Sequence, residues 1–465
     1  MTSVFPARQG WRLASLSLAM LLPSLGISVA NIALPSLRTA FGVTSQDAQW
    51  VVIAYLVVVT SSLVTAGRLG DLLGRKLLLL VGIAVFSLAS VAAVFSSTIW
   101  MVVLLRAIQG VGAAVMMSLT VAAVSDAVPA ERSGTAIGLL GTVSAIGTAA
   151  GPSLGGFLVG MFGWSSIFVL MAGVGLLALL LIATQLSSGV TANGRTTVDL
   201  PGASILMLSV AAFALATTLS PVTTVNGILA AVAVLGAMAF VYVERRASAP
   251  LVQLGIVARR AVAAGLLSIG LVSAIVMTTL VVGAFYLTGV LGLDTASAGL
   301  VMTIGPAVSA IVGLPAGRLV DRNGANATTY AGLFALLAGT VGMMVLPGII
   351  GLAGYICSLV LITSGYALFQ AANNTALMAG AQRDQRGVTS ALLALGRNVG
   401  LITGASAMGA LFTFASGGTA TGGPFGLQVV FAAASAFVVL ALALSAWAAR
   451  STGPDSKCRS RQASF

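Results

Sequence analysis

The sequence has little charge and no histidine. Charged residues make up 7% of the 465-residue chain and hydrophobic residues 58%, whereas a soluble globular protein carries about 25% charge. The mean hydropathy is +1.09. A soluble core could not bury this much apolar surface, so most of the chain is expected to face lipid.

The absence of histidine and the scarcity of cysteine exclude several chemistries. Without His, the usual zinc sites, His-based catalytic triads and His-ligated haem are unavailable. The two cysteines, Cys357 in an apolar run and Cys458 near the C-terminus, provide neither a disulfide framework nor a metal cluster. The sequence therefore predicts a protein that is not an enzyme, with no catalytic residue, no metal and no cofactor.

About fourteen apolar stretches have the length of a membrane span. They lie near 13–34, 49–67, 77–95, 100–123, 135–160, 165–186, 201–220, 226–243, 262–290, 297–317, 329–346, 349–372, 388–414 and 427–449. The number falls to twelve or thirteen if the run around 201–243 does not cross.

The basic residues test this map, because cytoplasmic loops of membrane proteins carry an excess of Lys and Arg. With the N-terminus in the cytoplasm, the cytoplasmic segments hold Arg8, Arg12, Arg68, Arg75, Lys76, Arg132, Arg195, Arg245, Arg246, Arg259, Arg260, Arg318, Arg322, Arg383, Arg386, Arg450, Lys457, Arg459 and Arg461. Arg38 falls on the opposite side, and Arg106 and Arg397 fall within spans. The net charge of +12 thus records membrane orientation, and no nucleic-acid partner is expected.

Two motifs recur at nearly one offset. Gly67, Arg68, Leu69, Asp71 and Gly74 return 250 residues later as Gly317, Arg318, Leu319, Asp321 and Gly324. Gly147, Gly151, Ser153 and Gly156 return 253 residues later as Gly400, Gly404, Ser406 and Gly409. The repeat predicts two parallel six-span halves, typical of transporters that rock about a central site, with room for two more spans within 187–260.

Four patterns, including the two motifs that recur, stand in order along the first half. They are Asn31, Ala33, Leu34 and Pro35; Gly67, Leu69, Asp71, Gly74, Arg75 and Lys76; Arg106, Gln109, Gly110, Gly112, Ala113 and Ala114; and Gly147, Gly151, Pro152, Gly155 and Gly156. With these motifs the chain resembles the major facilitator superfamily, specifically its fourteen-span drug:proton antiporter branch of the multidrug-efflux type.

The resemblance implies an all-α integral membrane protein with the major facilitator fold. Two parallel six-helix bundles, residues 1–186 and 261–465, would flank a 187–260 linker with two additional central spans, and a short basic cytoplasmic tail would end the chain. It also implies a gating loop at Gly67, Asp71, Gly74, Arg75 and Lys76, repeated at Gly317, Asp321 and Gly324. The span-five exporter motif would be Gly147, Gly151, Pro152, Gly155 and Gly156. The alternative for the gating loop is a hairpin turn with topogenic charges. The alternative for the exporter motif is ordinary helix packing.

Polar residues inside apolar spans are the candidates for a substrate cavity, because intramembrane charge is costly and by default marks a functional site. They are Arg106, Asn31, Gln109, Tyr55, Tyr286, Gln370, Asn373, Asn374 and Arg397. For each arginine the alternative is a guanidinium that hydrogen-bonds to carbonyls of neighbouring helices.

All ten acids fall in loops or at span ends, and Gly26 stands where the resembled branch has an acid. An exporter of cations is expected to carry a protonatable acid in its cavity. The sequence therefore favours neutral, amphipathic or anionic substrates attracted by Arg106. Proton coupling would use a peripheral acid such as Asp71, Asp47 or Asp294, or a protonatable substrate.

The predicted function is secondary active transport by alternating access, with export of drug-like or metabolite molecules. One alternative is an uncoupled facilitator or importer of a neutral or anionic metabolite, and another is a lipid flippase or membrane sensor. The expected partners are a small-molecule substrate, protons and the lipid bilayer. We expect a monomer in the plasma or inner membrane, with both termini cytoplasmic.

Overall fold

The computed structural model describes residues 7–127, 133–186, 200–218, 224–247, 254–379, 386–417 and 424–450. Within these ranges every regular element is a helix. The elements are α1 (Ala7–Phe41), α2 (Ser45–Leu73), α3 (Arg75–Val94), α4 (Ile99–Ala127), α5 (Ser133–Phe162), α6 (Ser166–Gln185), α7 (Leu200–Thr218), α8 (Thr224–Arg246), α9 (Leu254–Val257), α10 (Arg260–Gly289), α11 (Thr295–Asn323), α12 (Ala325–Ala379), α13 (Arg386–Thr403), a π-helical turn (Gly404–Met408), α14 (Gly409–Ala415) and α15 (Pro424–Arg450). The basic tail after residue 450 lies outside the described residues.

Eleven helices of the described chain are long and apolar enough to cross a membrane. Two shorter apolar helical segments, Ile146–Phe162 and Pro201–Thr217, accompany them. The longest helix, α12, bends at Ile350 and Gly351, where Gly351 has φ +56°. Glycine adopts this left-handed conformation without steric cost, and the bend falls at the junction of the stretches expected at 329–346 and 349–372.

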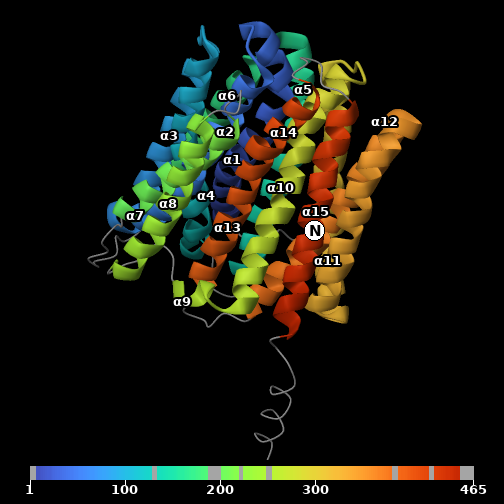
Figure 1. The fold of residues 1–465 in the computed structure, drawn as a ribbon. Helices are drawn as coiled ribbons and strands as arrows, with labels where there is room; N and C mark the ends of the chain where they lie inside the picture. The colour runs from blue at the N-terminus through green and yellow to red at the C-terminus, as the bar shows by residue number, and fades with distance from the viewer. Residues whose placement is uncertain are drawn as a thin grey trace, which may run out of the picture.

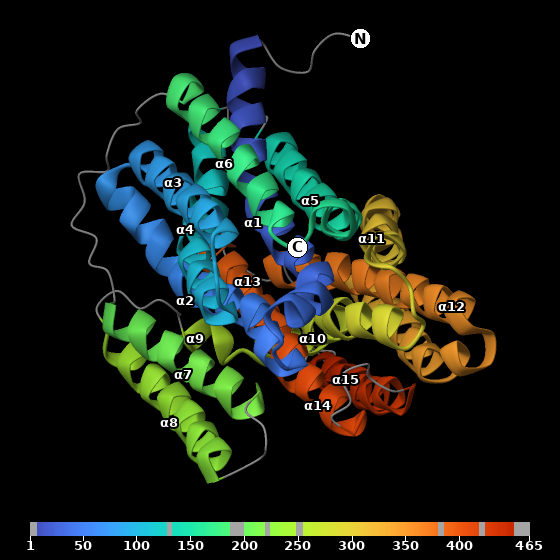
Figure 2. The ribbon, with the colours of Figure 1, turned by 90° about the horizontal axis from the view of Figure 1, so that it is seen from above.

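The helices form two groups, with α1 to α6 on one side and α10 to α15 on the other (Figures 1 and 2). On one flank α5 packs on α11. On the other flank α7 contacts α2 of the first group and α13 of the second. Phe240 of α8 packs with Leu392 of α13 and with Val262 and Leu266 of α10. The helix pair α7–α8 therefore bridges the two groups on the side away from α5 and α11.

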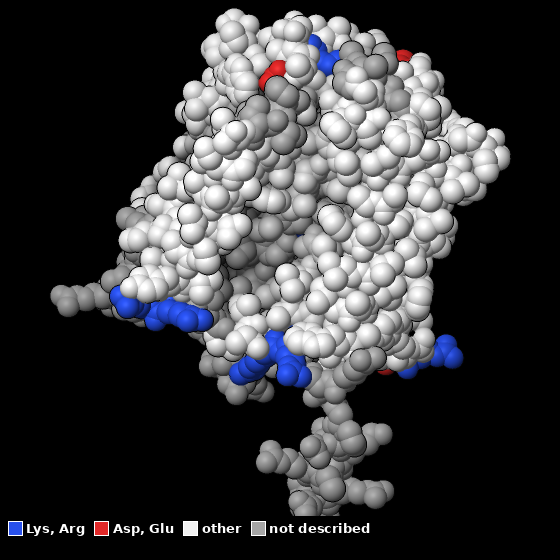
Figure 3. Space-filling model, in the orientation of Figure 1, with Lys and Arg blue, Asp and Glu red and all other residues white. Residues whose placement is uncertain are grey.

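The two groups meet closely at one end of the bundle. A Cβ atom on Gly156 of α5 would lie 2.9 Å from the Cα of Gly299, near the start of α11, and a Cβ on Gly409 of α14 would lie 2.7 Å from Oε1 of Gln49, near the start of α2. The basic residues at the end of α8, at the start of α10 and at the end of α11 belong to the opposite end, where most of the blue side chains in Figure 3 lie. The bundle is therefore closed at the end remote from these basic residues.

The repeat is visible in the helix termini. The turns after α2 and α11 are made by Gly74 (φ +91°) and Gly324 (φ +83°), which explains glycine at both motif positions. Thr44 and Asp47 form a reciprocal capping box at the start of α2. Asp294 caps α11 and accepts hydrogen bonds from Ser297 N (2.9 Å) and Oγ (2.7 Å). Of the suggested peripheral coupling acids, Asp294 is thus the N-cap of α11 and Asp47 is the capping-box partner of the N-cap Thr44.

Candidate functional site

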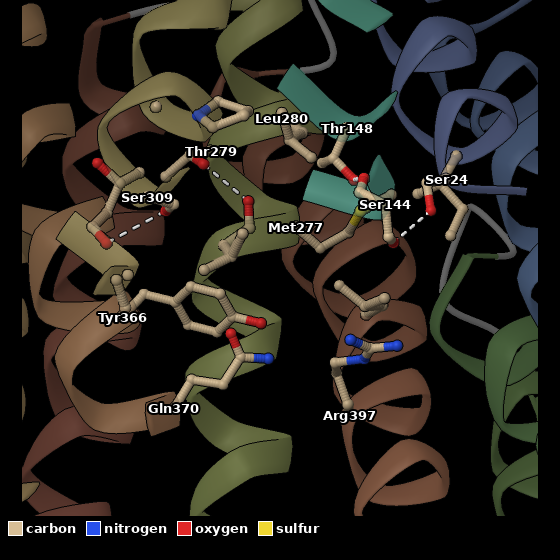
Figure 4. A pocket seen from close by; sticks show the side chains of 18 of the residues that line it. Ser24, Ser144, Thr148, Met277, Thr279, Leu280, Ser309, Tyr366, Gln370 and Arg397 are labelled. Atoms are coloured by element: carbon tan, nitrogen blue, oxygen red, sulfur yellow. Dashed lines mark hydrogen bonds between the residues drawn. The ribbon is translucent and has the colours of Figure 1, made fainter. Parts of the chain in front are cut away.

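A cavity of about 530 Å³ lies between the two helical groups. Helices α1, α4 and α5 line it from one side and α10 to α13 from the other (Figure 4). Its volume suits a drug-sized molecule. The lining residues are Met20, Ser24, Ile27, Met117, Ser144, Thr148, Val276, Met277, Thr279, Leu280, Met302, Gly305, Pro306, Ser309, Gly313, Tyr355, Leu359, Thr363, Tyr366, Ala367, Gln370, Ala371, Asn374, Arg397 and Leu401.

Much of the wall is apolar and deformable. Met20, Met117, Met277 and Met302 all line the cavity. Methionine has an unbranched, polarisable side chain that fits ligands of different shape. These residues can therefore contact the apolar part of a substrate without strict shape selection.

Hydroxyl groups form a second component of the wall. Ser24 Oγ of α1 and Ser144 Oγ of α5 lie 2.6 Å apart, and Thr148 Oγ1 donates to the Ser144 carbonyl oxygen at 3.0 Å. Across the cavity, Ser309 Oγ of α11 donates to the Thr363 carbonyl oxygen at 3.3 Å. The sequence does not mark these residues as cavity candidates, because serine and threonine are common in membrane helices.

Arg397 of α13 provides a cation in the cavity wall. Its Nε is buried and has no hydrogen-bond partner within the described part of the chain. Tyr366 and Gln370 of α12 point toward the part of the cavity where Arg397 lies (Figure 4), and Asn374 lines the same wall with a buried Oδ1 that lacks a partner. Of the predicted cavity residues, the structure brings Gln370, Asn374 and Arg397 together.

The repeat offered a signal for Ser144 that the residue type did not. Ser144 lies 253 residues before Arg397, which is the offset of the motif shared by α5 and α13. Both residues line the cavity. Equivalent positions of the two halves therefore face the same space.

Arg106, predicted as a cavity residue, is not among the residues that line this cavity. It is completely buried and donates from Nε to the Val51 carbonyl oxygen (3.0 Å), from Nη1 to Gln109 Oε1 (2.9 Å) and from Nη2 to the Gly26 carbonyl oxygen (2.8 Å). Its guanidinium carbon lies 4.0 Å from the centre of the Tyr55 ring. These contacts satisfy the buried cation inside the first helical group, so it need not face the cavity.

The other predicted polar residues also lie behind the wall. Gln109 donates to Ser90 Oγ (2.6 Å), Tyr55 to the Pro23 carbonyl oxygen (3.1 Å) and Asn31 to the Ile27 carbonyl oxygen (2.7 Å).

In the second group the remaining candidates likewise stand one layer back. Asn373 donates to the Gly265 carbonyl oxygen (3.3 Å). Tyr286 stacks on Tyr355, a lining residue, with ring centres 5.9 Å apart. Tyr286 can therefore influence the cavity through Tyr355.

The exporter-motif glycines pack mainly against other helices of the first half. Cβ atoms on Gly147 and Gly155 would lie 3.0 Å from the Leu21 carbonyl oxygen and 2.7 Å from Val29 Cγ2, both on α1, and Gly151 faces Ser28. These three glycines therefore pack against α1 within the first half and not across the two halves. Gly156 does meet the other half, at Gly299, and Pro152 lies beside it within α5.

The two gating-loop motifs differ in their packing. A Cβ on Gly67 would lie 2.7 Å from Ser118 Oγ of α4, and Lys76 Nζ donates to the Ala183 carbonyl oxygen at 3.0 Å. Arg75 begins α3, while the Asp71 side chain lies outside the described residues. In the second half a Cβ on Gly317 would meet nothing within 4 Å, and Asp321 is exposed. These contacts leave the gating role a prediction.

Apolar helices in two repeat-related groups around a central cavity define a multi-pass membrane transporter. The sequence model of the Major Facilitator Superfamily matches residues 16–405, and the chain belongs to this superfamily. It is thus a transporter and not an enzyme.

Known relatives agree with this assignment. The chain is 30% identical to the multidrug resistance protein Stp of Mycobacterium tuberculosis, over 82% of this chain and 72% of that protein. It is 28% identical to the riboflavin transporter RibZ of Clostridioides difficile, over 87% and 89%. The crystal structure of a bacterial homologue of the human lysosomal transporter Spinster shares the fold, with a TM-score of 0.70, 16% identity and coverage of 96% and 98%. Multidrug resistance and multidrug efflux proteins are thus among the relatives of this chain.

Proposed function

We propose that this protein exports drug-like or metabolite small molecules by alternating access. The observation that carries the proposal is the cavity between the two halves, lined by α1, α4 and α5 on one side and by α10 to α13 on the other. When the two halves rock against each other, a site between them opens first to one side of the membrane and then to the other. The closure at Gly156 and Gly299 fits a state open toward the opposite end. The multidrug resistance protein Stp, a relative, favours export.

The orientation and the number of spans follow from the same proposal. We place the basic ends of α8, α10 and α11 in the cytoplasm, as the positive-inside rule requires. The cavity then belongs to a cytoplasm-facing state. Counting α12 as two spans and including α5 and α7 gives fourteen crossings with both termini cytoplasmic. Residues 1–186 and 261–465 form the moving bundles of a monomer in the plasma or inner membrane, and 187–260 carry the additional pair.

Proton coupling of the transport depends on where a protonatable acid lies. None of the described residues that line the cavity is a carboxylate, so a proton would be carried by an acid outside the cavity or by the substrate. An uncoupled facilitator is the second candidate function, favoured by this acid-free wall.

Flux measurements in proteoliposomes test the proposal. We expect a neutral amphipathic dye to be transported against the direction of proton flow, so that it accumulates in the compartment with the higher proton concentration. This accumulation should be lost when an uncoupler is added. Equilibrating flux that ignores the uncoupler would establish the facilitator instead. Absence of flux for cationic, neutral and anionic dyes alike would overturn both transport functions.

A further inference from the structure

Arg397 is the only basic residue among the described residues that line the cavity, and none of these residues is an acid. Its buried Nε has no hydrogen-bond partner among the residues that the structure describes. A cation inside a membrane protein is costly unless it is paired or hydrogen-bonded. Such a guanidinium is a binding site for an oxyanion, because its planar array of N–H donors matches the two oxygens of a carboxylate.

A second cation, Arg106, contacts the backbone of α1 next to a residue that lines the cavity. Arg106 Nη2 donates to the carbonyl oxygen of Gly26, the residue that precedes the lining residue Ile27. Among the described residues, Arg106 contacts two carbonyl oxygens, an amide oxygen and an aromatic ring, so its charge is solvated but not paired with an acid. Interactions between charges are stronger inside a protein than in bulk water.

The rest of the wall suits an organic anion with an apolar body. Gln370 and Tyr366 point toward the Arg397 side of the cavity (Figure 4) and offer further hydrogen-bond donors. Met117, Met277 and Met302 line other parts of the wall. None of the described lining residues is an acid that would repel an anion.

We infer that the substrates are amphipathic organic carboxylates, and that Arg397 binds their carboxylate group. This inference rests on the proposed transport function and names its substrate class. It separates this protein from an exporter of cations, because two positive charges and an acid-free wall disfavour a cation at the same site.

Binding to the purified full-length protein tests the inference directly. The probes are tritium-labelled carboxylate, primary amide and methylammonium derivatives of naphthalene, measured by scintillation proximity on immobilised protein. We expect the carboxylate to bind about tenfold or more tightly than the amide, as a charge-assisted pair predicts. Equal or tighter binding of the amide or the ammonium compound would overturn the inference.

Variants assign the preference to Arg397. Arg397→Gln should abolish the preference for carboxylate and leave the amide affinity within about twofold, since only the charged interaction is removed. Arg397→Lys should restore part of it. Arg322→Gln is the matched control, because it removes an equal charge from an exposed position at the end of α11. If Arg397→Gln retained the full preference for carboxylate, Arg397 would not be the binding residue. If this variant does not fold, the comparison of carboxylate and amide binding to the wild-type protein still tests the inference.

Flux of the same probes separates this inference from the proposed function. Selective binding of the carboxylate without flux of any probe would refute transport and leave the carboxylate site standing. Flux of all three probes without selective binding would leave transport standing and refute the carboxylate site.

Discussion

A Cβ atom on Gly156 of α5 would lie 2.9 Å from the Cα of Gly299 on α11. The two helices thus meet backbone to backbone at the closed end of the bundle. A Cβ on Gly299 would in turn overlap the Pro152 carbonyl oxygen. Because backbone atoms cannot move aside as a flexible side chain can, this contact requires glycine on both helices.

Gly299→Ala is therefore expected to open this end. The added methyl group should destabilise the closed arrangement by about 1–3 kcal/mol and increase the population open at the Gly299 end. In a background without native cysteines, a cysteine at the lining position Thr279 should react at least about threefold faster with an impermeant maleimide added from that side.

The control for this experiment is Gly173→Ala. A Cβ on Gly173 of α6 would meet nothing within 4 Å, so the same substitution should leave the labelling rate unchanged. If Gly299→Ala and Gly173→Ala gave the same rate, the α5–α11 contact would not hold this end closed.

Arg106 and Arg397 should respond differently to substitution. Arg106 reaches three acceptors with a rigid planar group, which a lysine cannot reproduce. Arg106→Lys keeps a buried charge with fewer partners and should cost about 3–5 kcal/mol of stability, more than the uncharged Arg106→Met. Thermal unfolding of the detergent-solubilised variants measures this order. If Lys were tolerated better than Met, water would reach the site and Arg106 would belong to the cavity.

These two residues also show how far sequence reasoning reached. Both arginines interrupt apolar runs, and the cost of an intramembrane charge marked both as candidates. The direction in which each side chain points depends on the rotation of α4 and α13 and on the neighbours Val51, Gly26 and Gln109. A sequence of a single chain does not contain that information. The alternative of an arginine bonded to carbonyls was foreseen and describes Arg106.

The fold was more predictable than the site. The repeat and the apolar stretches predicted the helical architecture, since hydrophobic length and period directly reflect membrane crossing. The contribution of Ser24, Ser144 and Thr148 to the cavity wall was missed, because small hydroxyl residues occur on packed and cavity-facing surfaces alike. The packing of Gly147, Gly151 and Gly155 against α1 shows the same limit: small residues predict close contact but not the partner helix.

The cap of α11 should make stability depend on pH. Hydrogen bonds from the backbone N–H and then the hydroxyl of Ser297 hold the pKa of Asp294 below its ordinary value, which is about 3.9. Because the folded pKa is the lower one, the stabilisation is present above the ordinary value and is lost as the pH falls through the folded pKa. Asp294→Asn retains a good cap without a titrating group. The stability difference between wild type and this variant should therefore shrink in acid, and a difference independent of pH would argue against the linkage.

Gly26→Asp places an acid beside the buried Arg106. A Cβ at this position would lie 3.3 Å from the Tyr55 hydroxyl and 3.5 Å from Phe86 Cζ, so a side chain requires a small shift of these neighbours. The carboxylate would pair with Arg106, whose Nη2 already donates to the Gly26 carbonyl oxygen, and would cancel the positive charge behind α1. We expect the variant to transport cationic dyes better and anionic dyes less well than wild type, with an altered pH dependence. Gly26→Ala adds the same Cβ without charge and serves as the control in proteoliposome flux. If the Asp and Ala variants had the same substrate preference and pH profile, the charge at this position would not control selectivity.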